Sequence, residues 1–346
     1  MLGWGILGCG DITEKRVAPA IAARPSSRLI WLQSRTAARA AELAARCPDA
    51  KSTGSRAEVL ADPEVGAVYV ATEHHRHAED VIAAAEAGKH VLCEKPLANS
   101  VADCLRMIEA CRANGVALQV AYYRRYYPKL LRMQALLEAG AIGEPVSAQA
   151  HLSSRLDPRR VTPENWRLNA ELSGGGALVD TGSHRLDLLC WLLGEPDRVA
   201  AFAECRELPI EAPDTETLLI RFRSGVHAVT RHGFRSRSRD ALEINGTQGA
   251  LSATPVDGPL LSLECDPARL RERAPELLAG AEETPEGLRW HLPKAENVHL
   301  PLIDDFTRRI AAGEPPRYSG EDGMQASRII EAAYESARTG RVTPAP

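Results

Sequence analysis

Trp4-Gly5-Ile6-Leu7-Gly8-Cys9-Gly10, near the start of the chain, is the stretch that decides the fold. Its apolar run predicts a buried strand, and the glycines directly behind it predict a tight turn into a helix. In a nucleotide-binding βα unit the first glycine permits the turn and the second lets a pyrophosphate approach the backbone. The helix N-terminus, here Asp11 and Ile12, supplies amide donors. Thr13 holds the third glycine position, where we expect it to loosen helix–strand packing without preventing phosphate binding.

The first 121 residues alternate short apolar runs with helical patterns. Further strands are predicted at Leu29–Leu32, Ala67–Ala71, His90–Cys93 and Ala117–Val120. Ser55-x-x-Glu58 and Ser100-x-x-Asp103 have the spacing of helix N-terminal caps, and Gly88 and Gly115 stand where helices should end. The alternation predicts the α/β class, with a doubly wound parallel Rossmann sheet over residues 1–121.

Residues 122–346 follow a different pattern and are predicted to form a second α/β domain. We expect a strand at about 146–152 and helices at about 128–139, 174–193, 302–312 and 320–339. Between Val199 and Leu251 the chain reads as successive strands without intervening helices, which predicts a mostly antiparallel sheet. Residues 255–293 have no assignable pattern.

Cys93-Glu94-Lys95-Pro96 closes one of the predicted strands. Burying an ammonium group is costly unless something compensates it, so a lysine here indicates a function. Ligands of open parallel sheets bind beyond the carboxyl ends of the strands. Lys95 is therefore expected where a nucleotide bound at the glycine turn would end, which indicates chemistry on a cofactor.

The end of the second strand, Gln33-Ser34-Arg35-Thr36, indicates which dinucleotide is bound. NAD enzymes place a carboxylate here to hold the ribose 2′-hydroxyl, and this segment has none. Ser34 can donate to a 2′-phosphate, and Arg35 can pair with it or stack on adenine. We predict NADP(H) in preference to NAD(H); the alternative is a solvent-facing polar turn.

Asp180 and His184 stand four residues apart in a glycine-rich segment, Gly174–His184. On a helix they share one face, and leucines and valines surround them. Histidine suits proton transfer because its unperturbed pKa is about 6.5, and a neighbouring carboxylate could hold substrate or tune the ring. The alternative is a satisfied polar pair in the core.

Two further segments are rich in functional side chains. Residues 74–77 include three histidines, but adjacent histidines alternate in direction and no cysteine neighbours them, which disfavours a metal. His77 is instead expected to begin the helix beneath the nicotinamide. The aromatic and basic run Tyr122–Pro128 lies at the predicted domain junction, which favours substrate contacts by Tyr123 and Arg124.

Composition restricts partners and location. The chain has 346 residues, 44% of them hydrophobic, and a net charge of −4, which argues against nucleic acid as a partner. Eight cysteines without a C-x-x-C pair indicate reduced thiols. The apolar runs are too short to cross a membrane, and the first strand leaves no room for a signal peptide. We expect a cytoplasmic protein.

Together these segments resemble the Gfo/Idh/MocA family of NAD(P)-dependent oxidoreductases over nearly the whole chain. The resemblance is carried by Gly5–Gly10, Val70-Ala71-Thr72 with His77, Ala83–Ala98, Asn165-Trp166-Arg167, Gly174–His184 and Ser319–Arg341. It implies a Rossmann domain and an α/β domain with a large open sheet, which often forms an oligomer interface, so a homodimer or homotetramer is expected. Glu73 and His74 depart from the Pro-Asn that the family usually has there, and Thr13 replaces a small residue.

The resemblance also implies residue roles. Lys95 would contact the reacting hydroxyl and the nicotinamide ribose, His184 would be the general acid/base, and Asp180 would hold substrate. Further cofactor contacts are implied for Thr72, His77, Glu94, Trp166 and Arg167.

One main hypothesis and two alternatives follow. The main hypothesis is an NADP(H)-dependent oxidoreductase that transfers a hydride between nicotinamide and a secondary alcohol or ketone of a sugar, cyclitol or dihydrodiol. One alternative is non-redox glycoside cleavage with tightly bound NAD, which Ser34 and Arg35 disfavour. The other is a catalytically silent binding or regulatory protein, which the presence of Lys95 and His184 disfavours.

Overall fold

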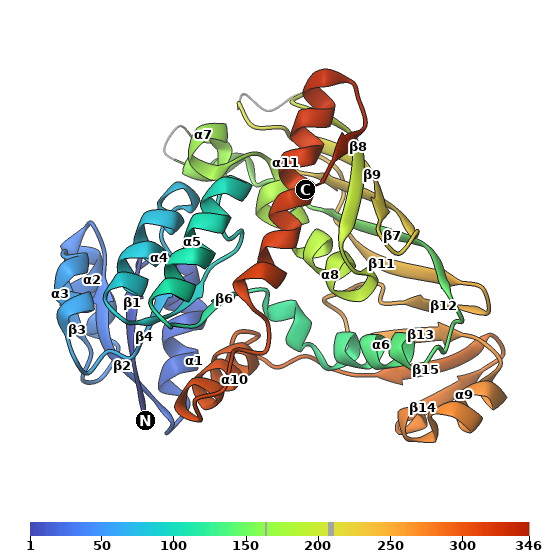
Figure 1. The fold of residues 1–346 in the computed structure, drawn as a ribbon, viewed down its shortest axis with the longest axis horizontal. Coiled ribbons are helices and arrows are strands. Elements are labelled where there is room, and N and C mark those ends of the chain that lie inside the picture. The colour runs from blue at the N-terminus through green and yellow to red at the C-terminus, as the bar shows by residue number, and fades with distance from the viewer. Residues whose placement is uncertain (163–164, 207–210, 346) are drawn as a thin grey trace. The chain divides into compact units, whose positions relative to one another are not determined.

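The structure of the protein is a computed structural model that describes residues 1–162, 165–206 and 211–345 (Figure 1). The chain divides into two compact units. The first unit comprises Met1–Tyr123 and Ala295–Ser327, and the second comprises Arg124–Lys294 and Arg328–Pro346. The chain therefore returns to the first unit after building most of the second.

The first unit contains a six-stranded sheet in the order β3-β2-β1-β4-β5-β6. Its strands are β1 (Leu2–Leu7), β2 (Ser27–Gln33), β3 (Lys51–Thr53), β4 (Ala67–Val70), β5 (His90–Cys93) and β6 (Leu118–Val120). All neighbouring pairs are parallel. This is the doubly wound dinucleotide-binding order, so the predicted Rossmann sheet is confirmed. The sequence missed β3 because the strand is three residues long and two of its side chains are exposed.

Helices connect these strands. They are a π-helical segment η1 (Thr13–Val17), α1 (Ala18–Ala22), α2 (Ala37–Ala44), α3 (Arg56–Ala61), a 3-10 turn η2 (His74–Arg76), α4 (His77–Glu86) and α5 (Val101–Ala113). Helices α4 and α5 pack side by side in this unit (Figure 1). From the returning segment, α10 (Leu300–Ala311) packs on α1 and places Phe306 against Trp4 of β1, with ring centroids 5.6 Å apart.

The predicted helix-capping residues are partly confirmed. Ser100 caps α5, because its hydroxyl accepts from the Asp103 amide at 3.1 Å. Gly88 and Gly115 follow α4 and α5 with positive φ, as helix-ending glycines should. Ser55 stands at the N-cap of α3, but its side chain makes no capping bond.

Thr13, at the third glycine position, contacts the glycine turn directly. Its side chain is fully buried, and its hydroxyl donates to the carbonyl of Gly8 at 2.6 Å. The threonine thus ties the start of the helical segment to the glycine turn, where we had expected loose packing.

The second unit is built on a ten-stranded sheet in the order β14-β15-β13-β12-β11-β7-β10-β9-β8-β16 (Figure 1). Its strands are β7 (Pro145–Ser153), β8 (Pro196–Glu204), β9 (Thr215–Phe222), β10 (His227–Gly233), β11 (Arg239–Gly246), β12 (Gly249–Ser252), β13 (Leu260–Glu264), β14 (Ala281–Thr284), β15 (Gly287–His291) and β16 (Thr343–Pro344). Strands β7 and β10 pair in parallel, and the other pairs are antiparallel. The predicted mostly antiparallel sheet is confirmed, and the unassigned residues 255–293 supply three of its strands.

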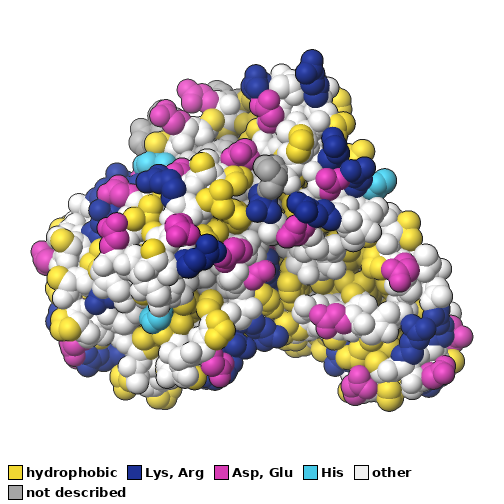
Figure 2. All heavy atoms as spheres, viewed as in Figure 1, with side chains coloured by type: hydrophobic (Ala, Val, Ile, Leu, Met, Phe, Trp, Pro, Cys, Tyr) yellow, Lys and Arg dark blue, Asp and Glu magenta, His cyan; other side chains and the backbone are white. Residues whose placement is uncertain are grey.

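The second unit also contains helical segments, some of which continue from the first unit. They are η3 (Tyr123–Tyr126), α6 (Pro128–Glu138), η5 (Trp166–Leu168), α7 (Ala170–Ser173), a π-helical segment η6 (Leu178–Gly182), α8 (Ser183–Leu193), α9 (Pro267–Arg273) and the end of α11 (Gly320–Thr339). The single helix predicted over 174–193 is therefore a glycine turn, a π segment and an α-helix. Gly182 lets this helix approach β10, because a Cβ there would lie 2.8 Å from the ring of His232. On the face shown in Figure 2, acidic and basic side chains are intermixed.

Candidate functional site

The glycine turn follows β1 and has the local geometry that a dinucleotide requires. Gly8 has φ +102°, and a Cβ there would lie 2.4 Å from the carbonyl oxygen of Ala71, so only glycine fits. A Cβ on Gly10 would meet no atom within 4 Å, so packing does not demand this glycine. The open space beside Gly10 suits a pyrophosphate approaching the backbone. Asp11 and Ile12 follow directly, and the Asp11 carboxylate pairs with Lys15 at 2.9 Å.

Lys95 follows β5 at the same edge of the sheet as the glycine turn, because both strands are parallel and both segments leave their carboxyl ends. The preceding Glu94 is buried and anchors this loop. Its carboxylate accepts from the Tyr69 hydroxyl at 2.7 Å and from the Lys95 amide at 3.1 Å. Lys95 itself is half-buried. The loop that carries the ammonium group is thus fixed by a buried carboxylate.

His299 completes this anchor and was missed from the sequence. Its Nε2 lies 3.5 Å from the Glu94 carboxylate, and its ring packs on Tyr123 with centroids 4.5 Å apart. Burial would raise the pKa of Glu94, but the nearby His299 ring, and then the Tyr69 hydroxyl, lower it to about 2. A single histidine before a helix belongs to no motif, so the contact became visible only with the fold.

The segment before His299 is tied to the helix that follows the glycine turn. Arg16 donates to the carbonyl of Glu296 at 3.2 Å, and Asn297 donates back to the carbonyl of Arg16 at 2.8 Å. The returning chain therefore joins the glycine turn to the lysine loop inside one unit.

His77 also contacts the loop that carries Lys95. Its ring is fully buried, with Nδ1 3.0 Å from the Pro96 carbonyl and Nε2 3.1 Å from the Thr72 carbonyl. Burial lowers its pKa against the effect of these carbonyls. The Thr72 hydroxyl donates to buried Asp80 at 2.8 Å. Both predicted residues thus lie at this edge of the sheet and hold the backbone there.

Ser34 and Arg35 follow β2 at the same edge. Ser34 Oγ accepts from the Thr36 amide at 3.3 Å. The Arg35 guanidinium is 63% exposed and pairs with Glu73, which follows β4, at 2.7 Å. Arg39 of α2, which we had not singled out, donates to the Cys9 carbonyl inside the glycine turn at 3.2 Å.

In the second unit, Asp180 lies in η6 and His184 in the first turn of α8. His184 is buried, whereas the Asp180 side chain is 28% exposed. π-Helical turns are frequent at functional sites, and η1 behind the Gly8 turn is another. Asp180 and His184 therefore lie on consecutive turns of one continuous helical segment.

Trp166 and Arg167 are brought to the same motif. The Arg167 guanidinium stacks 4.6 Å from the Trp166 ring and lies 3.9 Å from the Asp180 carboxylate. The structure thus places Trp166 and Arg167, expected to contact cofactor, beside Asp180, which was expected to hold substrate.

The two basic residues of the run Tyr122–Pro128 have separate acidic partners. Arg124 is buried and makes a bidentate pair with Asp257, at 3.2 and 2.9 Å. Arg125 makes a buried pair with Asp187 of α8, at 2.6 Å. Asp257 lies in the segment without an assignable pattern, so its pairing with Arg124 could not be foreseen.

The glycine triplet before η6 is explained by close packing within the second unit. A Cβ on Gly175 would lie 2.3 Å from the Tyr334 hydroxyl, and one on Gly176 would lie 1.6 Å from the Pro213 carbonyl. The same hydroxyl accepts from the Gly176 amide at 3.0 Å. The triplet therefore fixes where the Asp180 helix begins.

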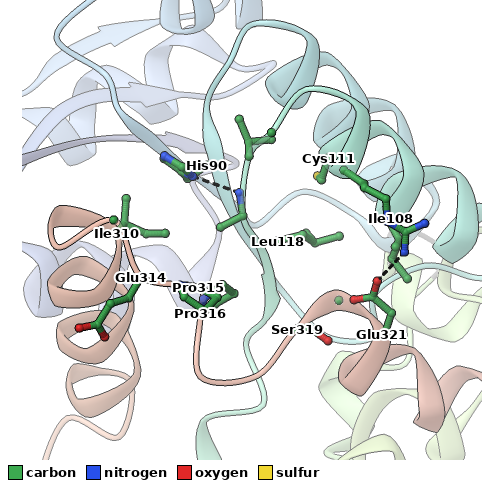
Figure 3. A pocket seen from close by; sticks show the side chains of 16 residues that line it. His90, Ile108, Cys111, Leu118, Ile310, Glu314, Pro315, Pro316, Ser319 and Glu321 are labelled. Carbon is green, nitrogen blue, oxygen red and sulfur yellow. Dashed lines mark hydrogen bonds and ion pairs between the residues drawn. The ribbon is translucent and has the colours of Figure 1, made fainter.

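A cavity of about 560 Å³ lies at the opposite, amino-terminal edge of the first unit's sheet (Figure 3). It is lined by His90 and Leu118 at the starts of two strands, by Cys111 of α5 and by the segment 313–321. Arg112 pairs with Glu321 at its rim, at 3.1 Å. Its position at the amino ends of the strands separates it from the nucleotide edge.

A Rossmann sheet with this turn, followed by a second sheet-bearing unit, defines the class of two-domain dinucleotide-binding proteins. Residues 2–122 match the model of the oxidoreductase family with an NAD-binding Rossmann fold, and residues 130–252 match the GFO/IDH/MocA C-terminal domain. The chain belongs to the Gfo/Idh/MocA family of oxidoreductases. It is an NAD(P)-dependent oxidoreductase acting on CH–OH groups.

Relatives in this family act on sugars. The chain is 32% identical over 287 residues to the 1,5-anhydro-D-fructose reductase of Ensifer adhaerens, covering 78% of this chain and 85% of the relative. It is 30% identical over 338 residues to D-xylose 1-dehydrogenase (NADP(+)) 2 of Haloferax volcanii, covering 97% and 98%. A levoglucosan dehydrogenase in complex with NADH and levoglucosan superposes with a TM-score of 0.85 at 26% identity, covering 100% and 99%.

Proposed function

We propose that the chain is an NADP(H)-dependent oxidoreductase that interconverts a secondary alcohol and a ketone of a sugar, cyclitol or dihydrodiol. The observation that carries the proposal is the shared sheet edge, where the glycine turn of β1 and the Lys95 loop of β5 both emerge. Reductases and dehydrogenases of sugars among the relatives support the substrate class. A trans-1,2-dihydrobenzene-1,2-diol dehydrogenase from Mus musculus, 30% identical, extends it to diols.

In this proposal the first unit holds the cofactor. The amides around Gly8, Gly10, Asp11 and Ile12 bind the pyrophosphate, and Ser34 and Arg35 bind the ribose 2′-phosphate. When bound, the nicotinamide supplies or accepts the hydride.

The chain's own side chains handle the proton and orient the substrate. In the oxidation direction, His184 takes the hydroxyl proton and Lys95 donates a hydrogen bond to the developing alkoxide. Asp180 binds a neighbouring hydroxyl and so selects which carbon reacts. A preorganised donor of this kind is typically worth about 3 kcal/mol, and acid/base help about 10²–10⁴-fold in rate.

The experiment that tests this function is a substrate panel. Sugars, cyclitols and dihydrodiols are incubated with NADP⁺ or NAD⁺, and the matching ketones with NADPH or NADH, while absorbance at 340 nm is followed. We expect turnover of at least one polyhydroxylated substrate, with NADP(H) preferred. Cleavage of a glycoside without net change at 340 nm would replace the proposal by the non-redox alternative. Binding without any turnover would replace it by the regulatory one.

We also propose that the protein is a homo-oligomer that pairs through the outer face of the ten-stranded sheet. Phe202, Leu219 and Val229 lie on the adjacent strands β8, β9 and β10 and are 78%, 53% and 44% exposed. Leu219 and Val229 stand directly opposite each other. Large apolar side chains gathered on one exposed face are typical of an interaction surface.

For location, we propose the cytoplasm. Six of the cysteines, Cys9, Cys47, Cys93, Cys111, Cys190 and Cys265, are free thiols, which suits a reducing compartment. Within the described residues, none of the helices has the length and apolarity needed to span a bilayer.

A further inference from the structure

The ion pair between Arg35 and Glu73 joins two loops at the nucleotide edge of the first unit. Arg35 follows β2 and Glu73 follows β4, and the guanidinium Nη2 lies 2.7 Å from the carboxylate Oε1. Glu73 is the less exposed partner, with 23% of its side chain accessible against 63% for Arg35. The guanidinium is therefore the more accessible member of the pair.

The strand order shows what this pair spans. Strand β1 lies between β2 and β4, so the pair reaches over the carboxyl end of β1, where the Gly8 turn begins. In doubly wound sheets the nucleotide lies beyond this end, with its adenosine ribose toward the β2 side. The pair therefore stands where the group that distinguishes the two dinucleotides must be accommodated.

The carboxylate at this point has a definite electrostatic effect. Residues Gln33 to Thr36 contain no acid, so β2 does not supply the carboxylate that usually meets the ribose hydroxyls. Glu73 supplies one from β4 instead. A 2′-phosphate carries close to two negative charges, and to bind Arg35 it must share that guanidinium with Glu73 or displace it. The unphosphorylated ribose meets no such competition.

We propose that Glu73 weakens the NADP(H) preference of this chain, by competing with the 2′-phosphate for Arg35 and thereby lowering affinity for NADP(H) relative to NAD(H). The inference rests on the proposed function, because it presumes that a dinucleotide binds at this edge. Wild-type preference for NADP(H) is then weaker than Ser34 and Arg35 would give alone. The competition acts between partly exposed charges, so its size is modest, roughly two- to fivefold in affinity at low salt.

The test is a fluorescence titration of the full chain with NADPH and with NADH. We expect Glu73→Gln to tighten NADPH binding about two- to fivefold at low salt, with NADH changed less than about 1.5-fold. The gain should shrink in high salt and in the background of Arg35→Gln.

A matched control exists at the other end of the same strands. Glu64 precedes β4 and pairs with Arg28 of β2 at 2.5 Å, at the amino-terminal edge. Glu64→Gln removes an equivalent surface pair and should change neither affinity. Unchanged or weaker NADPH binding in Glu73→Gln, with the wild type binding both nucleotides, would overturn the role of Glu73 alone. A wild type that binds neither nucleotide would overturn the proposed function and this inference with it.

Discussion

The buried contact between His299 and Glu94 allows a quantitative prediction for His299→Leu. Leucine fills much of the volume of histidine but cannot interact with the Glu94 carboxylate. The carboxylate would then have only its hydrogen bonds from the Tyr69 hydroxyl, at 2.7 Å, and from the Lys95 amide, at 3.1 Å. Removing one partner of a buried charged group is strongly destabilising. We expect the free energy of unfolding to fall by about 2–3 kcal/mol at pH 7.

The magnitude follows from the pKa of Glu94, which the fold lowers from 4.5 to about 2. At 1.36 kcal/mol per pKa unit, this difference stabilises the folded state by about 3 kcal/mol. Because the folded pKa is the lower one, the stabilisation is complete above pH 4.5 and is lost as the pH falls toward 2. Without His299, fewer groups counter the effect of burial, which raises the pKa of Glu94. The pKa in the folded state therefore rises, and most of this stabilisation is lost.

The assay is urea unfolding, followed by tryptophan fluorescence, of the wild type, His299→Leu and His299→Gln at pH 7 and pH 3. The difference between wild type and leucine variant should fall by half or more at pH 3, since Glu94 is then almost fully protonated in the unfolded state. The glutamine variant, which keeps a donor, should recover part of the loss at pH 7. An equal loss at both pH values would show that packing, and not the carboxylate, is responsible.

Three further predictions concern the other elements of the account. Burial, helped by Asp214, raises the pKa of Glu216 to about 8, so the free energy of unfolding of the wild type should fall as the pH rises from 4.5 to 8. The Glu216→Gln variant should not show that fall, and urea unfolding at pH 8 should find it more stable than the wild type by a few kcal/mol. Gly8→Ala should lower the melting temperature, because the added Cβ would clash with the Ala71 carbonyl. Gly10→Ala should leave the melting temperature unchanged but weaken cofactor binding in a titration. Equal losses of stability in the two variants would refute this distinction. Phe202→Glu should lower the mass measured by light scattering toward that of a monomer, and an unchanged mass would argue against the sheet face as the interface.

Much of the first unit could be predicted because its signals are local. The Gly8 turn, the Ser100 cap and the glycines after α4 and α5 each depend on a few neighbouring residues. Thr13 shows the limit of this reasoning: its hydroxyl replaces close glycine packing by a hydrogen bond, which depends on a rotamer that the sequence does not display.

The contacts that support the candidate site depend on chain segments far apart in sequence. His299 reaches Glu94 from more than 200 residues away, and Asp257 reaches Arg124 from a stretch without periodicity. Glu73 was noticed as a departure from the family pattern, but its pairing with Arg35 required the strand order. Sequence motifs predicted the candidate reactive residues, and the fold showed which residues contact and support them.

Single-turnover hydride transfer in a Lys95→Met variant tests the central claim most directly. With an identified substrate and saturating cofactor, we predict that the variant loses at least roughly a hundredfold in rate at 340 nm, while its cofactor dissociation constant changes only a few-fold. Wild-type turnover in the variant, or a loss confined to cofactor affinity, would contradict the assignment of Lys95 to the reacting hydroxyl.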